Sequence, residues 1–414
     1  MRLMWLSDRM LGGSSAYSKI TFETCTRLAS NGYQVAHIPM GRSNLLGKNI
    51  YHGVLLYPSG DDPWCEDVAL RDYLDFKADM LITLKEPWVF RYVYKDPINF
   101  VPTAVIDHSP VSGSITSRLA VAFKVIAISR FGQMELRKQG IESEYIPHGV
   151  SEVYRPLEDK VACRKMFFLE KDDFVVGIVA MNRARKMIPR MLRGYKRFLE
   201  LNPDAKSHLL LWTSVVPDTR PEDALPVGVA DVGVNLIPEI MELGLGSPPN
   251  DVRWFKPEEW SKLMAMGGLL EWDPTGGWDM VKLYNTMDCL LLCSGGEGAG
   301  LPLLEAAACG VPGITTDYAA SPEYVGPGLV VPWKDYVIYD TYGSRRALAD
   351  IDAMAEALTK IYNADREKLA KKALTFAERY RWNNIIETYW KPFLNKCAEE
   401  LYPLVNESGV TSWA

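Results

Sequence analysis

Short apolar runs rich in β-branched residues alternate with amphipathic stretches along the whole chain. In one amphipathic stretch, apolar side chains recur at helical spacing from Ile188 to Leu199. Strands that alternate with helices predict parallel sheets covered by helices on both faces. The runs typical of buried strands are Leu3–Leu6, Gln34–Ile38, Met80–Thr83, Thr103–Ile106 and Val125–Ile128, and then Phe174–Val179, Leu209–Trp212, Val252–Phe255, Cys289–Cys293, Gly313–Thr315 and Leu329–Val331.

The alternation restarts near residue 170, after a polar stretch from Pro147 to Lys160 that is typical of a linker. We therefore predict an α/β fold with two Rossmann-like, doubly wound domains facing each other across a deep cleft. The first is expected to span residues 1–155 and the second residues 156–385, with a helix over 386–414 that returns to the first domain. Open α/β sheets bind ligands at the carboxyl ends of their strands, so two such sheets would form one site together.

The composition is that of a globular protein, with 48% hydrophobic and 24% charged residues. The 414 residues carry a net charge of −6, which argues against strong non-specific binding to nucleic acid. No apolar run approaches the roughly 20 residues that span a bilayer, and the N-terminus is typical of a first strand rather than a secretory signal. Seven cysteines without a CxxC pair suit reduced thiols. These features predict a cytoplasmic protein that can work at the periphery of a membrane.

A glycine-rich stretch between Cys293 and Pro312 is the most informative part of the sequence. A buried strand is expected to end at Ser294, and a helix is expected from Leu301 to Gly310. A glycine-rich loop that leads into a helix N-terminus presents backbone N–H groups to an anion. The sequence therefore predicts a phosphate or diphosphate site. The residues expected to form it are Gly296, Gly298, Ala299, Gly300 and Leu301.

Two carboxylates accompany this loop, Glu297 in the turn and Glu305 about one turn into the helix. A phosphate would repel both of them, so each is expected to serve another part of the ligand. Sugar hydroxyls are donors that a carboxylate accepts. The alternative is that Glu305 only caps or solubilises the helix and that the glycines only form a turn.

Three cations in four residues, Arg183, Arg185 and Lys186, follow the predicted strand Phe174–Val179. Cations at the end of a strand can neutralise a departing diphosphate. The alternative is a solvated charge run that opens a helix. The presence of the two glutamates in the same predicted domain favours the diphosphate interpretation.

These stretches together resemble the retaining glycosyltransferases of family 4, which have the two-domain architecture called GT-B. The resemblance lies in Glu297 and Glu305 with seven residues between them, and in Cys309–Pro312, Ser321–Glu323 and Pro147–Val150. It implies that the second domain binds a nucleotide-sugar donor and the first binds the acceptor. It also implies that Glu305 holds the ribose and Glu297 the donor sugar, with no cofactor and no divalent metal required.

The sequence departs from the family at two positions. Met181 stands where the family has an arginine that holds the donor diphosphate, whereas Lys186 matches the family lysine. We expect Arg183 or Arg185 to supply the missing charge. Ala299 stands where the family commonly has Phe or Trp, which leaves the donor sugar open.

The resemblance adds two further positions. Gly13, in the loop after the first strand, would face the donor phosphate and the acceptor, although the loop is as compatible with a simple turn and helix cap. His108 follows the strand Thr103–Ile106, and the family often has a histidine there that contacts the transferred sugar. The alternative for His108 is a histidine that is hydrogen-bonded within its loop.

The sequence thus predicts a retaining glycosyltransferase that moves a sugar from a UDP- or GDP-sugar to a hydroxyl of a glycan, a lipid-linked or another acceptor. Its expected catalytic residues are Glu297, Arg183, Lys186 and His108. Two other classes stay open: a sugar-nucleotide epimerase or phosphorylase of GT-B fold, and a non-catalytic protein that binds sugar nucleotides. Asp350 and Asp352 have the spacing of a metal-binding pair, but their place at a helix start favours a structural role.

Overall fold

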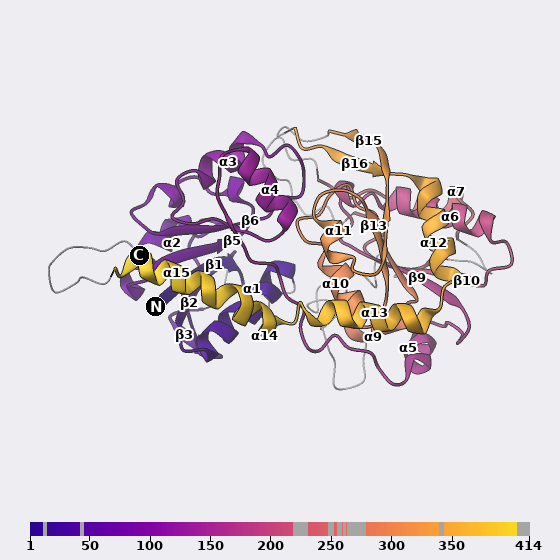
Figure 1. The fold of residues 1–414 in the computed structure, drawn as a ribbon, viewed down its shortest axis with the longest axis horizontal. Coiled ribbons are helices and arrows are strands. Elements are labelled where there is room, and N and C mark those ends of the chain that lie inside the picture. The colour runs from indigo at the N-terminus through magenta and orange to yellow at the C-terminus, as the bar shows by residue number, and fades with distance from the viewer. Residues whose placement is uncertain are drawn as a thin grey trace. The chain divides into compact units, whose positions relative to one another are not determined.

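The chain forms two compact units in a computed structural model (Figure 1). The structure describes residues 1–10, 15–41, 45–217, 231–246, 252–254, 259, 262, 279–338 and 343–403. The first unit comprises Met1–Val105, Gly113–Gly149 and Arg381–Ala414, and the second comprises Ile106–Ser112 and Val150–Tyr380. The chain therefore passes between the units four times.

The first unit is built on an eight-stranded sheet. Seven of its strands run parallel, and β3 alone pairs antiparallel with its neighbour β4. The strands at its centre, β1 and β5, are buried along almost their whole length, as expected for a sheet that is covered on both faces. In spatial order the strands are β3 (Asn49–Tyr51), β4 (Val54–Leu56), β2 (Gln34–Met40), β1 (Arg2–Asp8), β5 (Met80–Leu84), β6 (Phe100–Ala104), β7 (Ile126–Ala127) and β8 (Glu144–Tyr145).

Hydroxyl caps fix the starts of two helices in this unit. Ser15 accepts from the Ser18 amide at the start of α1, and Ser129 accepts from the Gly132 amide at the start of α4. The helical segments of this unit before residue 150 are α1 (Ala16–Ser30), α2 (Glu66–Phe76), η1 (Pro87–Val89), η2 (Val93–Lys95), α3 (Gly113–Leu119) and α4 (Arg130–Lys138).

The last helical segment of the chain also belongs to the first unit. It consists of α14 (Trp382–Ile385), a π-helical turn η5 (Ile386–Trp390) and α15 (Lys391–Leu401). Pro392 has no N–H to donate to the preceding turn, which accounts for a wider turn at this point. The Trp390 ring packs 5.4 Å from the Trp5 ring of β1. The last helical segment of the chain thus covers apolar side chains of the first strand.

The second unit is built on a six-stranded, fully parallel sheet. The first strand of the unit, β9, lies between the second and the fourth, so the order of connection reverses beside it. In spatial order the strands are β11 (Val252–Arg253), β10 (Ser207–Trp212), β9 (Phe174–Val179), β12 (Cys289–Leu292), β13 (Gly313–Thr316) and β14 (Leu329–Val331). Ligands of open α/β sheets bind at such a reversal point, outside the carboxyl ends of the strands.

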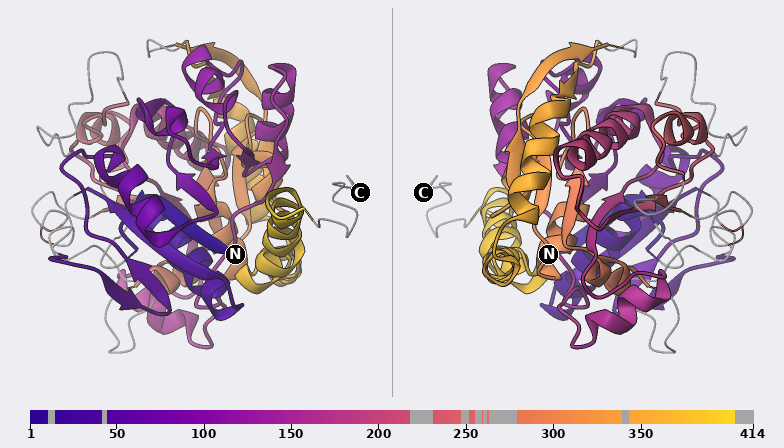
Figure 2. Two further views of the ribbon diagram at one scale, coloured as in Figure 1. Left: turned by 90° about the vertical axis from the view of Figure 1, so that its left-hand side faces the viewer. Right: turned by 90° about the vertical axis from the view of Figure 1, so that its right-hand side faces the viewer.

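Helices cover the faces of this second sheet. The apolar face of α6 packs on the sheet, with Met191, Leu192 and Tyr195 fully buried. Helices α6 and α12 lie side by side (Figure 2). The helical segments are α5 (Lys160–Met166), η3 (Ala184–Lys186), α6 (Ile188–Leu201), α7 (Ile237–Glu242), α9 (Met280–Thr286), α10 (Leu301–Ala308), α11 (Ser321–Tyr324), α12 (Ile351–Tyr362) and α13 (Arg366–Glu378).

A small hairpin completes the second unit. Its strands are β15 (Trp333–Val337) and β16 (Arg346–Ala349), which pair antiparallel. The side chains of β15 are exposed, whereas Arg346 at the start of β16 is buried. Asp350 follows β16 and caps α12 through the Ala353 amide, so the expected structural role of this aspartate is what the structure shows.

The predicted fold class is confirmed. Both units are α/β, and each contains a parallel or largely parallel sheet with helical connections. Among the described residues, no helix has the length and apolar character that crossing a membrane requires.

Candidate active site

The reversal point of the second sheet brings two chain segments together. The segment after β9 carries Arg183, Arg185 and Lys186, and the segment after the neighbouring strand β12 carries the glycine-rich loop. Because β9 and β12 are parallel neighbours, both segments leave the sheet at its carboxyl edge. Lys186 and Arg185, which are 111 and 112 positions from Glu297 in sequence, therefore meet it.

Glu297 lies between two cations. Its Oε1 accepts from Lys186 Nζ at 2.5 Å, and its Oε2 lies 3.2 Å from Arg185 Nη1. The carboxylate is buried, with 7% of its side chain exposed. Burial of an ion pair requires good geometry and further hydrogen bonds to be favourable, and both oxygens of Glu297 have a partner here.

The charges of this cluster shift the pKa values of its members. Burial alone would raise the pKa of Glu297, but Lys186 and Arg185 outweigh it, so the pKa lies below its usual range. Burial, together with the neighbouring Arg185, lowers the pKa of Lys186. The pKa of Arg185 is raised, because Glu297, Asp107 and Asp231 outweigh the effect of burial. At neutral pH the site thus holds an ionised glutamate within a field of fixed cations.

A second carboxylate orients Arg185 from another direction. Asp231 accepts from the Arg185 amide at 3.0 Å and from Arg185 Nε at 3.1 Å. The backbone carbonyl of Asp231 lies 3.4 Å from Arg183 Nη1. Asp231 therefore fixes the guanidinium whose Nη1 faces Glu297.

The glycine-rich loop leads into α10 as the sequence predicts. Gly300 precedes the helix in the left-handed region at φ +78°, Pro302 lies in the first turn, and Gly310 follows the helix at φ +79°. Gly296 is also in the positive-φ region, at +150°. Ala299 is buried, with 7% of it exposed. This geometry places the N-terminus of α10 beside Glu297, where an anion would meet N–H groups.

Glu305 lies on the first turns of α10 and is half-buried. Its Oε2 accepts from the Tyr284 hydroxyl at 2.6 Å. Tyr284 belongs to α9 and is fully buried, so it holds the carboxylate in one orientation. The N-cap of α10 is Gly300, which argues against the interpretation of Glu305 as a simple helix cap.

The segment Ile106–Ser112 contributes a histidine to this unit. His108 Nδ1 lies 2.7 Å from Asp107 Oδ1, and Asp107 Oδ2 lies 2.9 Å from Arg346 Nη1. The same Arg346 nitrogen donates to the Asp107 carbonyl at 3.2 Å. Burial would raise the pKa of Asp107, but Arg346, His108 and Arg185 together hold it well below its usual range.

Gly296 is where this segment touches the glycine-rich loop. A Cβ at Gly296 would lie 2.2 Å from the backbone oxygen of Asp107. We expect Gly296→Ala to destabilise the unit by about 1–3 kcal/mol through backbone strain and to displace the loop. Thermal unfolding checks this, with Gly113→Ala as control, because a Cβ there meets nothing within 4 Å. Equal stability of the two variants would contradict the expectation.

The structure thus brings most of the predicted site residues into one unit. Glu297, Arg185 and Lys186 meet directly. Asp107, the partner of His108, also contributes to the raised pKa of Arg185. Gly13 lies outside the described residues. Met181, at the position where the family has an arginine, is 66% exposed.

Four residues of the site were not predicted from the sequence. Tyr284 contacts the predicted Glu305, and Asp107 stands next to the predicted His108. Arg346 contacts Asp107 across a long sequence separation. Asp231 lies beyond the strand β10 and reaches Arg185 from there. Of these, only Asp107 carried a signal, because an acid directly before a candidate histidine can set its tautomer.

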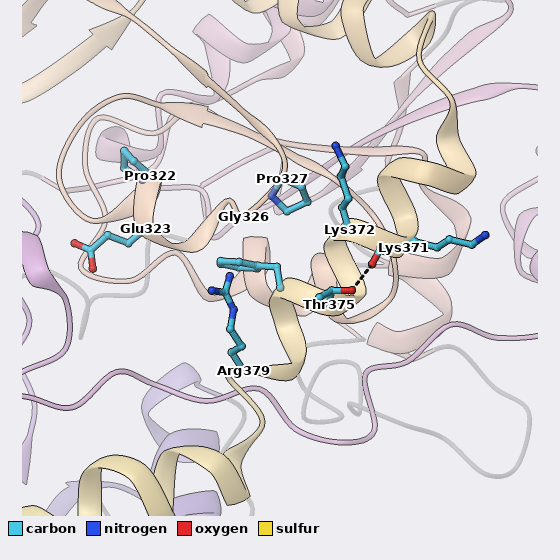
Figure 3. A pocket seen from close by; sticks show the side chains of 9 residues that line it. Pro322, Glu323, Gly326, Pro327, Lys371, Lys372, Thr375 and Arg379 are labelled. Atoms are coloured by element: carbon cyan, nitrogen blue, oxygen red, sulfur yellow. Dashed lines mark hydrogen bonds between the residues drawn. The ribbon is translucent and has the colours of Figure 1, made fainter.

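No cluster of three or more His, Cys, Asp or Glu that could hold a metal ion occurs within the described ranges. A separate surface pocket of about 500 Å³ lies between α11 and α13 (Figure 3). Pro322 and Glu323 of the predicted Ser321–Glu323 motif line it, together with the cations Lys371, Lys372 and Arg379. It shares no lining residue with the cluster around Glu297.

Three solved structures share the fold over almost the whole chain. The chain is similar to the sucrose-phosphate synthase of Thermosynechococcus elongatus at 17% identity and a TM-score of 0.66, over 96% of this chain and 100% of that one. It is similar to HepE of Anabaena, solved with UDP and glucose, at 16% identity and a TM-score of 0.63, over 96% and 100%. It is also similar to WaaG, a glycosyltransferase involved in lipopolysaccharide biosynthesis, at 14% identity and a TM-score of 0.62, over 97% and 100%. The fold is that of the GT-B glycosyltransferases.

One part of the second unit matches a known family in sequence. Residues 256–364 match the family model described as "Glycosyl transferases group 1". This range includes both Glu297 and Glu305. The chain therefore carries a match to a group 1 glycosyltransferase domain in the unit that holds the candidate site. No curated protein sequence matches the chain.

Proposed function

We propose that this enzyme moves a hexose from a UDP-sugar to an acceptor hydroxyl with retention at the anomeric carbon. The observation that carries the proposal is Glu297, a buried carboxylate between Lys186 and Arg185 at the reversal point of the donor-side sheet. Complexes of HepE with UDP and with UDP-glucose support uracil as the base of the donor nucleotide. We propose that the second unit binds this donor and that the first unit binds the acceptor.

The cations would hold the diphosphate of the donor. Lys186 and Arg185 already face Glu297, and the N-terminus of α10 adds backbone N–H groups nearby. A diphosphate brings at least two negative charges, which offset the excess of cations when Arg183 joins them. The missing family arginine at Met181 is best replaced by Arg185, because its guanidinium is fixed by Asp231.

The two glutamates would accept hydrogen bonds from hydroxyls of the donor. Glu305 would accept from the ribose with the oxygen that Tyr284 leaves available, and Glu297 would accept from the donor sugar. His108 would contact the same sugar from the segment Ile106–Ser112. No divalent metal is required in this proposal, since the cations and the helix N-terminus supply the positive charge.

The reaction would be a substitution on one face of the sugar. The bond between the anomeric carbon and the diphosphate oxygen breaks, and the acceptor oxygen bonds to that carbon on the same face. The acceptor proton passes to the departing phosphate oxygen. Lys186 and Arg185 would stabilise the charge that develops on the diphosphate.

Donor binding is the first property to measure. We expect UDP to raise the melting temperature, with or without magnesium, and GDP to do so much less. A ligand at 100 times its Kd stabilises the folded state by about 2.7 kcal/mol, which a thermal-shift assay detects. Glu305→Ala should weaken UDP binding about tenfold or more, through the lost ribose contact.

The matched control is Lys372→Ala, in the separate pocket beside α13. It should bind UDP as the wild type does. A preference for GDP would overturn the choice of base, and an unchanged UDP affinity in Glu305→Ala would overturn the ribose contact. Absence of any nucleotide binding would contradict the proposed function.

A further inference from the structure

We propose that Asp107 and Arg346 are positioning residues that hold His108 in one tautomer, so that its Nε2 accepts a hydrogen bond from a hydroxyl of the donor sugar. The inference rests on the proposed function for the identity of the ligand. It adds a role for two residues outside the glutamate pair and outside the cation run.

The tautomer follows from the chemistry of the partner. Asp107 Oδ1 lies 2.7 Å from His108 Nδ1. The pKa of Asp107 lies well below its usual range, so this carboxylate is ionised and can only accept. Nδ1 must therefore carry the hydrogen. In a neutral ring, Nε2 is then the acceptor.

Nε2 of His108 is buried and meets no hydrogen-bond partner among the described residues. The whole side chain is buried, with 6% of it exposed. A buried polar atom without a partner is destabilising, and a bound group that donates a hydrogen bond would remove that cost. The ring is thus held by one nitrogen and offers the other to a ligand.

Arg346 holds Asp107 in place. The second oxygen of Asp107 pairs with Arg346 Nη1 at 2.9 Å, so the carboxylate that faces His108 is fixed from its other side. Arg346 also donates to the Asp107 backbone carbonyl at 3.2 Å and so fixes the segment that carries the histidine.

The position of the group links it to the donor loop. The Asp107 carbonyl approaches Gly296 so closely that a Cβ there would lie 2.2 Å from it. Gly296 immediately precedes Glu297. The donor sugar that Glu297 would hold therefore lies within the region that His108 borders, and a sugar hydroxyl is a donor of the kind that Nε2 requires.

A competing explanation is that the Asp107–Arg346 ion pair only anchors the segment Ile106–Ser112 to the β15–β16 hairpin and has no role in orienting His108. A double-mutant cycle separates the two explanations. We expect Asp107→Asn to lower kcat about 10- to 100-fold, with a smaller change in the KM for the donor. In a His108→Gln background, the same substitution should cause no further loss. Equal losses in both backgrounds would overturn the inference and support the anchoring role alone.

The tautomer itself can be measured without any activity. The chain has five histidines, so nitrogen NMR of histidine-labelled protein gives few signals, and His108→Gln assigns the one of interest. We expect the Nδ1–H tautomer in the wild type and its loss or mixture in Asp107→Asn. An Nε2–H tautomer in the wild type would overturn the inference whatever the enzyme does.

A matched control exists in the same unit. Asp173 Oδ2 lies 3.3 Å from His208 Nε2, so this aspartate also faces a histidine ring. Because His208 and Asp173 lie at the amino end of the sheet, Asp173→Asn should leave kcat and the His108 signal unchanged. A protein with the expected tautomer that transfers no sugar would overturn the proposed function and the hydroxyl contact, and would still support positioning by Asp107.

Discussion

Glu297→Gln is expected to abolish most of the sugar transfer while leaving nucleotide binding intact. The amide keeps the shape of the carboxylate but turns an N–H₂ toward hydroxyls that need an acceptor. We expect kcat/KM for the donor to fall about 10²- to 10³-fold, the range seen when one stabilising contact to a transition state is removed. Steady-state kinetics with UDP-sugar and a binding isotherm with UDP alone measure the two effects.

The binding half of this expectation follows from the ion pairs. In the wild type, the Glu297 carboxylate forms ion pairs with Lys186 and Arg185 before a donor binds. The variant releases both cations for the diphosphate, so UDP should bind at least as tightly as before. A loss of UDP affinity as large as the loss of kcat/KM would contradict the proposal that Glu297 contacts the sugar while the cations bind the diphosphate.

Lys186→Met is expected to reduce both transfer and UDP binding. The substitution removes the cation with the shortest contact to Glu297 and keeps an apolar side chain of similar length. We expect kcat to fall about 10²- to 10³-fold through the lost stabilisation of the departing diphosphate. Single-turnover kinetics at saturating donor isolates this step.

The same variant should shift the acid limb of the curve that relates the free energy of unfolding to pH. In the wild type the folded-state pKa of Glu297 lies below its usual range, so its ionised form contributes stability above the usual carboxyl pKa of about 4.3. That contribution is lost only as pH falls through the lowered value. Without Lys186, the largest of the effects that oppose burial is lost, so the pKa of Glu297 rises and the acid limb moves to higher pH. An unmoved limb would mean that Glu297 does not control it.

Much of the second unit could be predicted because its central strands are buried on both faces. Phe174–Val179 forms a strand over the residues expected, since an uninterrupted apolar run marks such a strand clearly. Leu329–Val331 also forms a strand over the residues expected, although it lies at the edge of the sheet and Val330 is exposed. In the first unit, β6 spans Phe100–Ala104, so it begins three residues before the predicted strand Thr103–Ile106 and ends two residues before it. Pro102 lies in the middle of β6, which can accommodate a proline whose nitrogen needs no partner.

The β15–β16 hairpin could not be predicted in this way. Its first strand, Trp333–Val337, is exposed along its whole length and shows no alternation of apolar and polar residues. Its existence depends on pairing with β16, which tertiary structure provides. The role of Arg346 was missed for the same reason, because it contacts Asp107 from 239 positions away.

The candidate site was predicted as separate parts, and the structure shows how they are connected. The sequence assigned Lys186 to phosphate and Glu297 to sugar, but not the direct pair between them. A pattern along the chain identifies residue types and spacing, whereas the partner of a buried charge depends on which strands are neighbours. The cleft expected between the two domains stays a prediction.

The three-segment construction of the first unit bears on the order in which a nascent chain can finish folding. Residues 1–105 and 113–149 leave the ribosome early, but the Trp390 ring that covers Trp5 emerges some 385 residues later. Until then the first sheet lacks a part of its apolar cover, while the intervening second unit can already close around its own core. Synthesis therefore creates an interval in which the amino-terminal half is exposed to aggregation and proteolysis, and the arrival of the last helix ends it.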